Sequence, residues 1–198
     1  MRPLRREEIL DLSTYERARD ELRPAVMEAK RRRRVHFGSS LTLLFENAVT
    51  MRYQVQEMIR AERMVKEAEI QHELETYGEL LGGPGELAAT LLIEIPDPEV
   101  RDRRLREWID LPGRVYLKLE DGERVRPRFD PRQVGTDRLS SVQYLNFDVK
   151  GRVPIAIGCD LGSLTGEQPL SEEQRAALSE DLRSDGAASE GAQPGASG

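Results

Sequence analysis

The chain has very few of the residues from which metal centres, disulfide frameworks and nucleophilic active sites are usually built. Its 198 residues include one cysteine, two histidines and one tryptophan. A single cysteine excludes an intrachain disulfide, and two histidines are too few for most metal sites or catalytic triads. The sequence also shows no secretory leader and no apolar run near the ~18 residues of a membrane helix, so we expect a cytoplasmic protein with no membrane partner.

The short motifs of common enzyme families are missing as well. There is no glycine-rich dinucleotide fingerprint, Walker A loop, G-x-S-x-G elbow, H-E-x-x-H zinc motif or paired C-x-x-C. Cys159 lies between Gly158 and Asp160 without a cationic neighbour, which favours a buried thiol over a nucleophile. We therefore predict no metal and no cofactor, and the sequence leaves open whether the protein is an enzyme.

Charge is unevenly distributed along the chain. The net charge is −6, with 36 acidic and 30 basic residues. Seven of the acidic residues but only two of the basic ones lie from Thr165 onward, so the preceding part, with 28 basic and 29 acidic residues, is nearly neutral. We expect neither a uniformly basic nor a uniformly acidic binding surface.

Four consecutive arginines, Arg31 to Arg34, form the most concentrated charge. Such a run is typical of a nucleic-acid or acidic-partner patch, but cations also complement the dipole at the end of a helix. The rest of the chain supplies no basic surplus, so we favour the helix terminus and expect no nucleic-acid binding.

The stretch from Arg31 to Asp97 contains almost every functional candidate. Its hydrophobic periodicity predicts, in order, two β-type runs, two helices, a Gly-Pro turn and a third β-type run, at 35–38, 41–46, 51–65, 69–81, 82–85 and 87–95. Before this stretch, Ser13 or Thr14 is predicted to cap a helix, and Pro24 either ends it or starts the next turn, with a second helical segment from Ala25 to Lys30. After it, Asp97 is predicted to cap a helix with Pro98 at its first position.

Two β-hairpins are predicted in the second half of the chain. Asp121-Gly122 and Lys150-Gly151 are turn dipeptides between runs of alternating apolar residues. The paired runs are 114–119 with 123–129, and 142–149 with 153–157. Strands of this kind suit an antiparallel sheet with helices on one face.

These elements predict an α+β fold, an antiparallel or mixed sheet with helices mainly on one face. Residues 1–164 are expected to form a single domain. In residues 165–198, Ser171 and Gln174 match a capping box for a short helix that reaches Leu182. The acidic, Gly-Ala-Ser-rich tail from Ser184 to Gly198 has no core-forming residue, and we expect it to be disordered.

One acidic residue interrupts the apolar face of the first helix in the central stretch. At about 100° per residue, Glu62 falls in the middle of a stripe made by Met51, Val55, Met58, Ile59 and Val65. A carboxylate in that position is predicted to be buried, and it is then either paired with an arginine or a functional group. We favour a structural ion pair.

Polar residues are dense in and beside this helix, and they form the candidate functional cluster. Its members are Glu46, Asn47, Gln56, Glu57, Arg60, Glu62 and Arg63. The next helix holds Glu69-x-x-His72, the spacing by which ferritin-like proteins bind iron. The chain has one such motif rather than two, and His72 falls on the polar face of its helix, so we favour a solvated helix surface.

The central stretch resembles a bacterial family catalogued only as a domain of unknown function. The similar run reads LTLLFEN…T…QVQEMIRAER…IQHELETYGELL…GELAATLLIEIPD, within a resemblance that covers roughly Met1 to Asp160. The matching positions that stand out are Phe45, Glu46, Asn47, Gln54, Gln56, Glu57, Arg60, Glu62, Arg63, Glu73, Leu74, Tyr77 and Glu94. The chain departs from the family pattern at Gly78, where asparagine is common, and at His72, where an acid is common.

The resemblance implies a small cytosolic protein often encoded beside a rubrerythrin-like protein and an iron–sulfur oxidoreductase, and it implies no activity. Two hypotheses follow. The chain is either an accessory or interaction protein of that iron-dependent redox system, or an enzyme or small-ligand-binding protein that uses the Glu/Arg cluster of residues 46–63. The partner, the substrate and the oligomeric state are left open.

Overall fold

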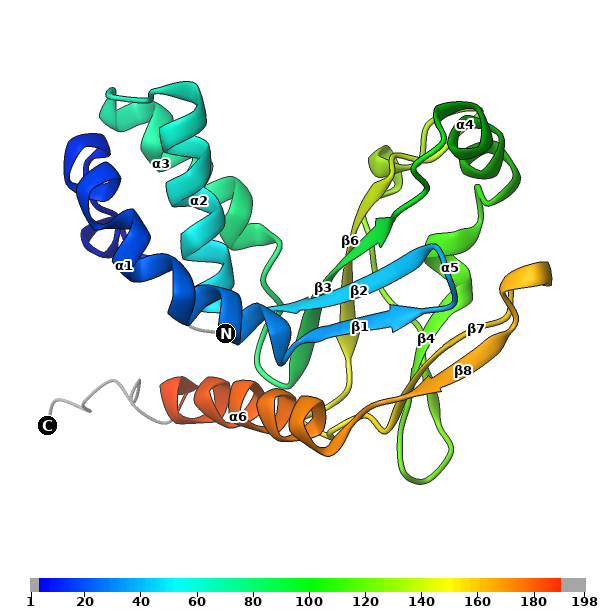
Figure 1. Ribbon diagram of the computed structural model, residues 1–198. Coiled ribbons are helices and arrows are strands. Elements are labelled where there is room, and N and C mark those ends of the chain that lie inside the picture. The colour runs from blue at the N-terminus through cyan, green and yellow to red at the C-terminus, as the bar shows by residue number, and fades with distance from the viewer. Residues whose placement is uncertain (1–3, 190–198) are drawn as a thin grey trace, which may run out of the picture.

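The computed structural model describes the backbone of residues 4–189 and the side chains of residues 4–183. Figure 1 shows a lobe of helices on one side, two β-sheets on the other, and a long C-terminal helix beneath the lobe. The lobe consists of α1 (Leu12–Arg31), α2 (Ala48–Glu62) and α3 (Glu67–Glu79). The α+β class is confirmed.

The first sheet has the strand order β1-β2-β3-β6, and all neighbours are antiparallel. Its strands are β1 (Arg34–Phe37), β2 (Leu41–Glu46), β3 (Glu86–Ile93) and β6 (Val142–Asp148). The second sheet has the order β5-β4-β7-β8 and is also antiparallel. Its strands are β5 (Arg124–Val125), β4 (Val115–Lys118), β7 (Ala156–Cys159) and β8 (Gly166–Pro169).

The two sheets share one hydrophobic core. Leu43 and Phe45 of β2 pack in it with Leu117 of β4 and Ile157 of β7. Because side chains alternate along a strand, the other residues of β2, such as Leu44, point to the opposite face of the first sheet, toward the helical lobe. All six residues of β2 are buried, as expected for a strand covered on both faces.

The remaining helices are short, apart from α6. They are α4 (Pro98–Glu107), α5 (Leu111–Arg114) and 3-10 turns at Arg6–Glu8, Pro131–Gln133 and Gly162–Leu164. The predicted cap of α4 is confirmed, since the Asp97 carboxylate accepts a hydrogen bond from the Val100 backbone N–H at 2.8 Å. No described helix is long and apolar enough to cross a membrane.

The N-terminal helix differs from the prediction. Asp11, rather than Ser13 or Thr14, caps α1, because its carboxylate accepts the Thr14 backbone N–H at 3.0 Å. Pro24 lies inside the helix instead of ending it. The proline removes one backbone hydrogen bond, but α1 packs along α2 and this contact stabilises the helix through the interruption.

The first predicted hairpin is confirmed, with β4 and β5 paired across Gly122, whose φ is +86°. The second hairpin is wrong. Lys150 and Gly151 do adopt the positive φ values of a tight turn, but β6 pairs with β3 and β7 pairs with β4. The turn therefore carries the chain from the first sheet to the second, which is why two sheets form where the sequence suggests one.

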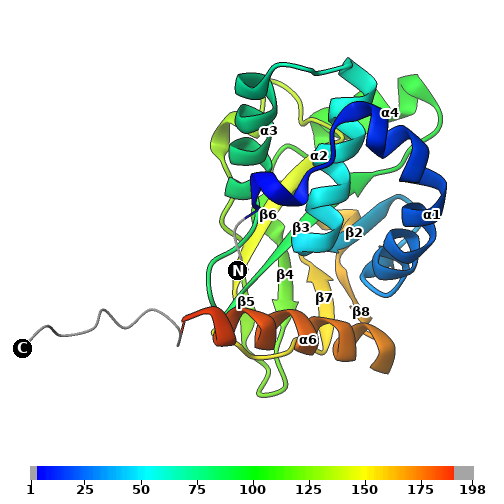
Figure 2. The same ribbon diagram turned by 90° about the vertical axis from the view of Figure 1, so that its left-hand side faces the viewer.

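The C-terminal helix α6 (Glu172–Ser189) crosses the ends of the strands, as Figure 2 shows. Its capping box is confirmed: the Gln174 backbone N–H bonds to the Ser171 hydroxyl, and the Ser171 N–H bonds to the Gln174 side chain. Leu178 and Leu182 join the core between the sheets. The helix extends beyond Leu182, and the rest of the predicted disordered tail, residues 190–198, lies outside the described residues.

Candidate functional site

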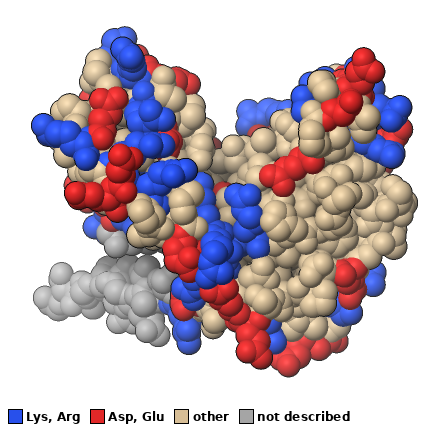
Figure 3. Space-filling model, viewed as in Figure 1, with Lys and Arg blue, Asp and Glu red and all other residues tan. Residues whose placement is uncertain are grey.

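A cavity of about 290 Å³ lies at the foot of the helical lobe, between α1, α2 and α3 and the first sheet. Leu44, Leu92 and Val142 give it an apolar floor on three strands. Its other lining residues come from seven helices and strands and are mostly polar: Lys30, Arg34, Glu46, Met51, Gln54, Tyr77, Thr90 and Tyr144. Figure 3 shows the hollow between the helical lobe and the lobe that carries α4, with basic side chains gathered near its base.

Glu46 is the buried acid of this cavity. Its side chain is at the end of β2, and the residue is 7% exposed. One carboxylate oxygen accepts the Thr90 hydroxyl at 2.8 Å and the other accepts the Thr50 hydroxyl. No ion pair joins Glu46 to a cation among residues 4–183. A buried carboxylate without a cation is costly, so two hydroxyl donors only partly offset the loss of water.

Two cations line the same cavity. Lys30 is in the last turn of α1 and Arg34 begins β1, and both are half-buried. The Lys30 ammonium lies 5.3 Å from the centre of the Tyr53 ring, a cation–π contact. Neither Lys30 nor Arg34 forms an ion pair with any acid in the described part of the chain. The cavity is therefore lined by two cations and one carboxylate that form no ion pair with one another.

Two tyrosines add hydrogen-bond donors to the cavity wall. Burial raises the pKa of Tyr144, and the neighbouring Tyr77 ring and the negative charge of Glu46 raise it further. Burial also raises the pKa of Tyr77, against a hydrogen bond with Gln54 that lowers it. Both phenols therefore stay protonated at neutral pH and can donate to a ligand.

Of the seven residues in the predicted cluster, only Glu46 lines this cavity. Asn47 caps α2: its side-chain oxygen accepts the backbone N–H groups of Val49 and Thr50, and its amide donates to Asp181 at 2.9 Å. Gln56 is buried and pairs with the backbone of Leu10 in both directions. These two side chains hold segments together.

Glu57 and Arg60 also belong to the packing of α1 against α2. The Glu57 carboxylate accepts hydrogen bonds from the Arg19 guanidinium at 2.7 and 3.0 Å and from the Tyr15 hydroxyl at 2.7 Å. The Arg19 guanidinium lowers the pKa of Glu57 to about 2. Arg60 makes a longer contact with the same carboxylate, at 3.4 Å.

The prediction for Glu62 is wrong, because its side chain is exposed. Helix α2 ends at this residue, and Arg63, also exposed, adopts a left-handed conformation with φ of +53°. Val65, which the helical wheel places on the apolar face, is 77% exposed, and Met64 is buried instead. The periodicity that centred the stripe on Glu62 stops at the helix end, so neither an ion pair nor a buried functional carboxylate exists there.

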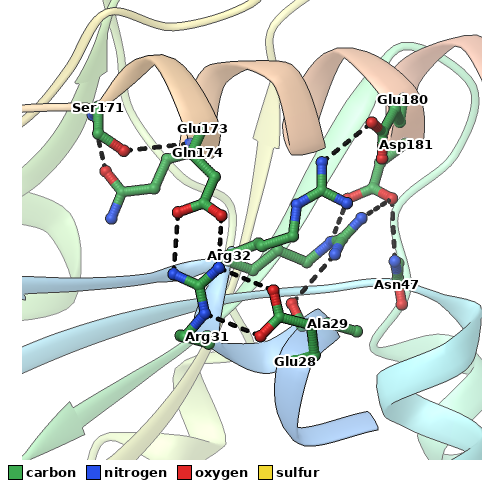
Figure 4. A network of polar contacts seen from close by, with 11 residues as sticks. Glu28, Ala29, Arg31, Arg32, Asn47, Ser171, Glu173, Gln174, Glu180 and Asp181 are labelled. Carbon is green, nitrogen blue, oxygen red and sulfur yellow. Dashed lines mark hydrogen bonds and ion pairs between the residues drawn. The ribbon is translucent and has the colours of Figure 1, made fainter. Parts of the chain in front are cut away.

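The arginine run completes a helix, as predicted, but its partners come from the far end of the chain. Lys30 and Arg31 are in the last turn of α1, and Arg31 pairs with Glu28 and with Glu173 of α6. Figure 4 shows this network between the end of α1 and α6. Acidic residues of α6 therefore pair with Arg31, Arg32 and Arg33 within the same molecule, whereas Arg34 forms no such pair among the described residues.

Arg33 makes the most buried contact of the network. Its Nε and Nη2 atoms donate to the Asp181 carboxylate at 2.7 and 2.8 Å, and its Nη1 atom donates to the Ala29 carbonyl at 3.0 Å. The two side chains are only 5% and 8% exposed. Asp181 also accepts the Asn47 amide, so the α6 anchor reaches the residue next to Glu46.

Cys159 and His72, the sequence candidates for thiol and metal chemistry, lie away from the cavity. Cys159 is buried in the core between the sheets, as predicted, and burial raises the pKa of its thiol. His72 is exposed on α3, which agrees with a solvated helix face. Neither residue contributes to the candidate site.

A protein-family comparison matches residues 3–182 to a single family, described as "Protein of unknown function (DUF3501)". The chain belongs to this family. A crystal structure of a "novel protein of unknown function" from Burkholderia pseudomallei K96243 is 30% identical, with a TM-score of 0.84 over 91% of this chain and 100% of the other. No curated protein matches the chain. The predicted resemblance to a family of unknown function is confirmed.

The sequence alone did not single out most of the cavity residues of this DUF3501 chain. Lys30 and Arg34 lie in or beside the basic run, and the sequence gave no reason to choose them from it. Arg34 differs from its buried neighbours Arg33 and Val35 because side chains alternate between the two faces along β1. Tyr144 comes from β6, a strand that the sequence paired with the wrong neighbour. Tyr77 and Gln54 were visible as positions shared with the family, but nothing placed them near Glu46.

Proposed function

We propose that the protein binds a small molecule that carries both a cationic and an anionic group, such as an amino acid, in the cavity at Glu46. The observation that supports this most directly is the presence of unpaired charges of both signs in one cavity. A ligand ammonium would offset the buried Glu46 carboxylate. A ligand carboxylate would be attracted by Lys30 and Arg34.

The register of the first sheet sets the spacing of these charges. Arg34 is opposite Leu44 in the β1–β2 ladder, and Glu46 is two residues further along β2. Arg34 and Glu46 are therefore diagonal neighbours on one face, with Cα atoms about 7–8 Å apart. A short ligand with its charges at opposite ends can therefore reach both side chains, and the volume of about 290 Å³ suits a small metabolite.

The polar wall would orient such a ligand. Each oxygen of Glu46 accepts one hydroxyl, which leaves it further lone pairs for an ammonium group. The protonated phenols of Tyr77 and Tyr144 would donate to ligand oxygens. Leu44, Leu92 and Val142, on the floor of the cavity, would pack against the carbon chain of the ligand. Both charged ends of the ligand and its apolar middle would therefore contact complementary side chains.

Calorimetric titration with a series of ω-amino acids tests the proposal. We would use glycine, β-alanine and γ-aminobutyrate, each compared with the carboxylic acid and the amine that lack one of its two charges. We expect one chain length to bind and its singly charged analogues to bind far more weakly. Equal binding of the carboxylic acid alone would contradict a role for Glu46.

Variants locate the binding. Glu46→Gln keeps the shape of the side chain but removes its charge, and should weaken binding roughly 10- to 100-fold. Arg34→Gln should also weaken it. Glu62→Gln is the matched control, because Glu62 belongs to the same segment but is exposed at the end of α2. Equal loss in the Glu46 and Glu62 variants would show that binding occurs elsewhere.

The family resemblance motivates a second proposal, an accessory role beside a rubrerythrin-like or iron–sulfur oxidoreductase partner. This proposal rests on the genetic neighbourhood that the resemblance implies. It is tested by affinity purification from the native cell, with the partner identified by mass spectrometry. Failure to retain such a redox protein under mild salt conditions would remove the proposal and leave ligand binding unaffected.

A further inference from the structure

Three polar side chains form a hydrogen-bonded chain on the face of the first sheet, outside the Glu46 cavity. The Nδ1 atom of His36 lies 2.9 Å from the Thr42 hydroxyl oxygen, and that hydroxyl donates to the carboxylate of Glu94. His36 and Thr42 are direct neighbours across β1 and β2. The imidazole and the carboxylate are exposed, whereas Thr42 is fully buried beneath them.

The direction of these bonds determines the tautomer of His36. A hydroxyl has one proton, and Thr42 donates it to a carboxylate oxygen of Glu94. The Thr42 oxygen must then accept from His36, so Nδ1 of the imidazole carries the hydrogen. In the neutral ring the lone pair is then on Nε2, the atom that attacks in histidines that act as nucleophiles or bases and are oriented by a third group.

Arg34 is a cationic neighbour of the His36 imidazole. Arg34 precedes His36 by two residues on β1, so the two side chains leave the same face of the sheet about 7 Å apart. Arg34 has no ion pair with any acid of residues 4–183, and Lys30 lines the same cavity as Arg34. An anionic group held by Arg34 would thus lie next to a nucleophilic nitrogen.

We propose that His36 is a phosphoryl-accepting residue, activated by Thr42 and Glu94 and served by Arg34 as the site for the phosphoryl oxygens. The donor class is a small phosphoramidate or acyl phosphate. This activity goes beyond ligand binding at Glu46, because it does not use the Glu46 carboxylate.

The transfer step balances without a further reactant. The nitrogen of phosphoramidate is already protonated, as an ammonium group bonded to phosphorus. The lone pair on Nε2 attacks phosphorus, the Nε2–P bond forms, and the P–N bond breaks so that ammonia leaves with the bonding pair. With an acyl phosphate, the P–O bond to the acyl group breaks and a carboxylate leaves. The ring becomes positively charged while its Nδ1 hydrogen stays bonded to Thr42. The Glu94 carboxylate, which accepts the hydrogen bond from Thr42, offsets the positive charge on the ring.

The chain contains its own control, since His72 is its other histidine. His72 is exposed on α3, and no hydrogen bond from a described residue fixes its ring. Incubation of the full-length protein with phosphoramidate, followed by mass spectrometry under alkaline conditions, should show one acid-labile phosphoryl group on His36. We expect His72 to be labelled much more slowly, and His36→Gln to abolish the fast reaction.

Variants of the two orienting residues separate activation from simple exposure. Thr42→Val has nearly the same shape and should slow labelling of His36 by roughly 10-fold, as when the orienting partner of a histidine is removed. Glu94→Gln, at an exposed position, should also slow it and keeps the test valid if the Thr42 variant folds poorly. Arg34→Gln should weaken saturation by the donor.

Three results would overturn the proposal. These are no phosphoryl group on His36, equal labelling rates for His36 and His72, and unchanged labelling of His36 in Glu94→Gln. The assay contains no amino-acid ligand, so its failure would not affect the titrations at Glu46. Likewise, failure of those titrations would leave the reactivity of His36 standing.

Discussion

The buried ion pair between Arg33 and Asp181 gives the sharpest prediction about stability. It joins the end of α1 to α6, two segments far apart in the sequence, and both side chains are nearly inaccessible to solvent. Removal of one member of a buried pair leaves the other charge uncompensated, which typically costs about 3–5 kcal/mol. We expect Asp181→Asn, which preserves the shape of the side chain, to lower the free energy of unfolding by this amount.

A double-mutant cycle separates the charge interaction from the packing. Arg33→Met removes the guanidinium but keeps much of its apolar stem, and should also lower the free energy of unfolding. In the double variant neither charge remains, and the carboxamide oxygen introduced by Asp181→Asn can still accept the Asn47 amide. The double variant should therefore be more stable than the sum of the single losses predicts.

Urea unfolding followed by circular dichroism measures these free energies, and Arg31→Gln provides the matched control. Arg31 lies in the same network and contacts Glu28 and Glu173, but it is 56% exposed, so its loss should be small. If Asp181→Asn cost no more than Arg31→Gln, burial would not govern the strength of this pair. Strictly additive losses in the double variant would equally refute the argument.

Two further predictions concern acid stability and the end of the chain. Arg19 lowers the folded-state pKa of Glu57 to about 2, so this pair contributes stability above pH ~4.5 and loses it as the pH falls toward 2. At neutral pH, Glu57→Gln should lower the free energy of unfolding by about 1–2 kcal/mol, a value that allows for screening of this partly exposed pair by solvent. The difference from the wild type should vanish near pH 2. A difference that stays constant with pH would contradict this. Deletion of residues 190–198, which have no large apolar side chain, should leave the melting temperature nearly unchanged, and a clear decrease would show that they dock.

Features that depend on neighbouring residues could be predicted from the sequence. The Asp97 cap, the Ser171 capping box and the Asp121-Gly122 hairpin each need only a few adjacent side chains, and all three are confirmed. The boundaries of β2 were likewise visible from its apolar run. Glu46 entered the candidate cluster as one of the polar residues that are dense in and beside the helix that follows this run.

Features that depend on distant contacts could not be predicted in this way. The turn at Lys150-Gly151 has the expected backbone conformation, but the turn residues do not determine which strand each arm pairs with. The end of α2 was hidden for a different reason. The residue that ends the helix in a left-handed conformation is Arg63, where a glycine is usual. After it, the Met64 N–H donates a hydrogen bond to the Ile59 carbonyl. Without a glycine, the sequence gives no sign that the helix ends here.

The same distinction explains why the candidate site lies at the start of α2 and not along it. Glu46 and Asn47 are adjacent, and the cap that starts the helix also positions Thr50, whose hydroxyl donates to Glu46. Asn47 bonds in turn to Asp181, so the anchor of α6 and the cavity acid share one hydrogen-bond network. Because Asp181→Asn retains an acceptor for Asn47, it should reduce stability without displacing Glu46, whereas Asn47→Ala should disturb both. Ligand titrations of these two variants therefore distinguish a cavity that depends on the cap from one that depends on the whole α6 anchor.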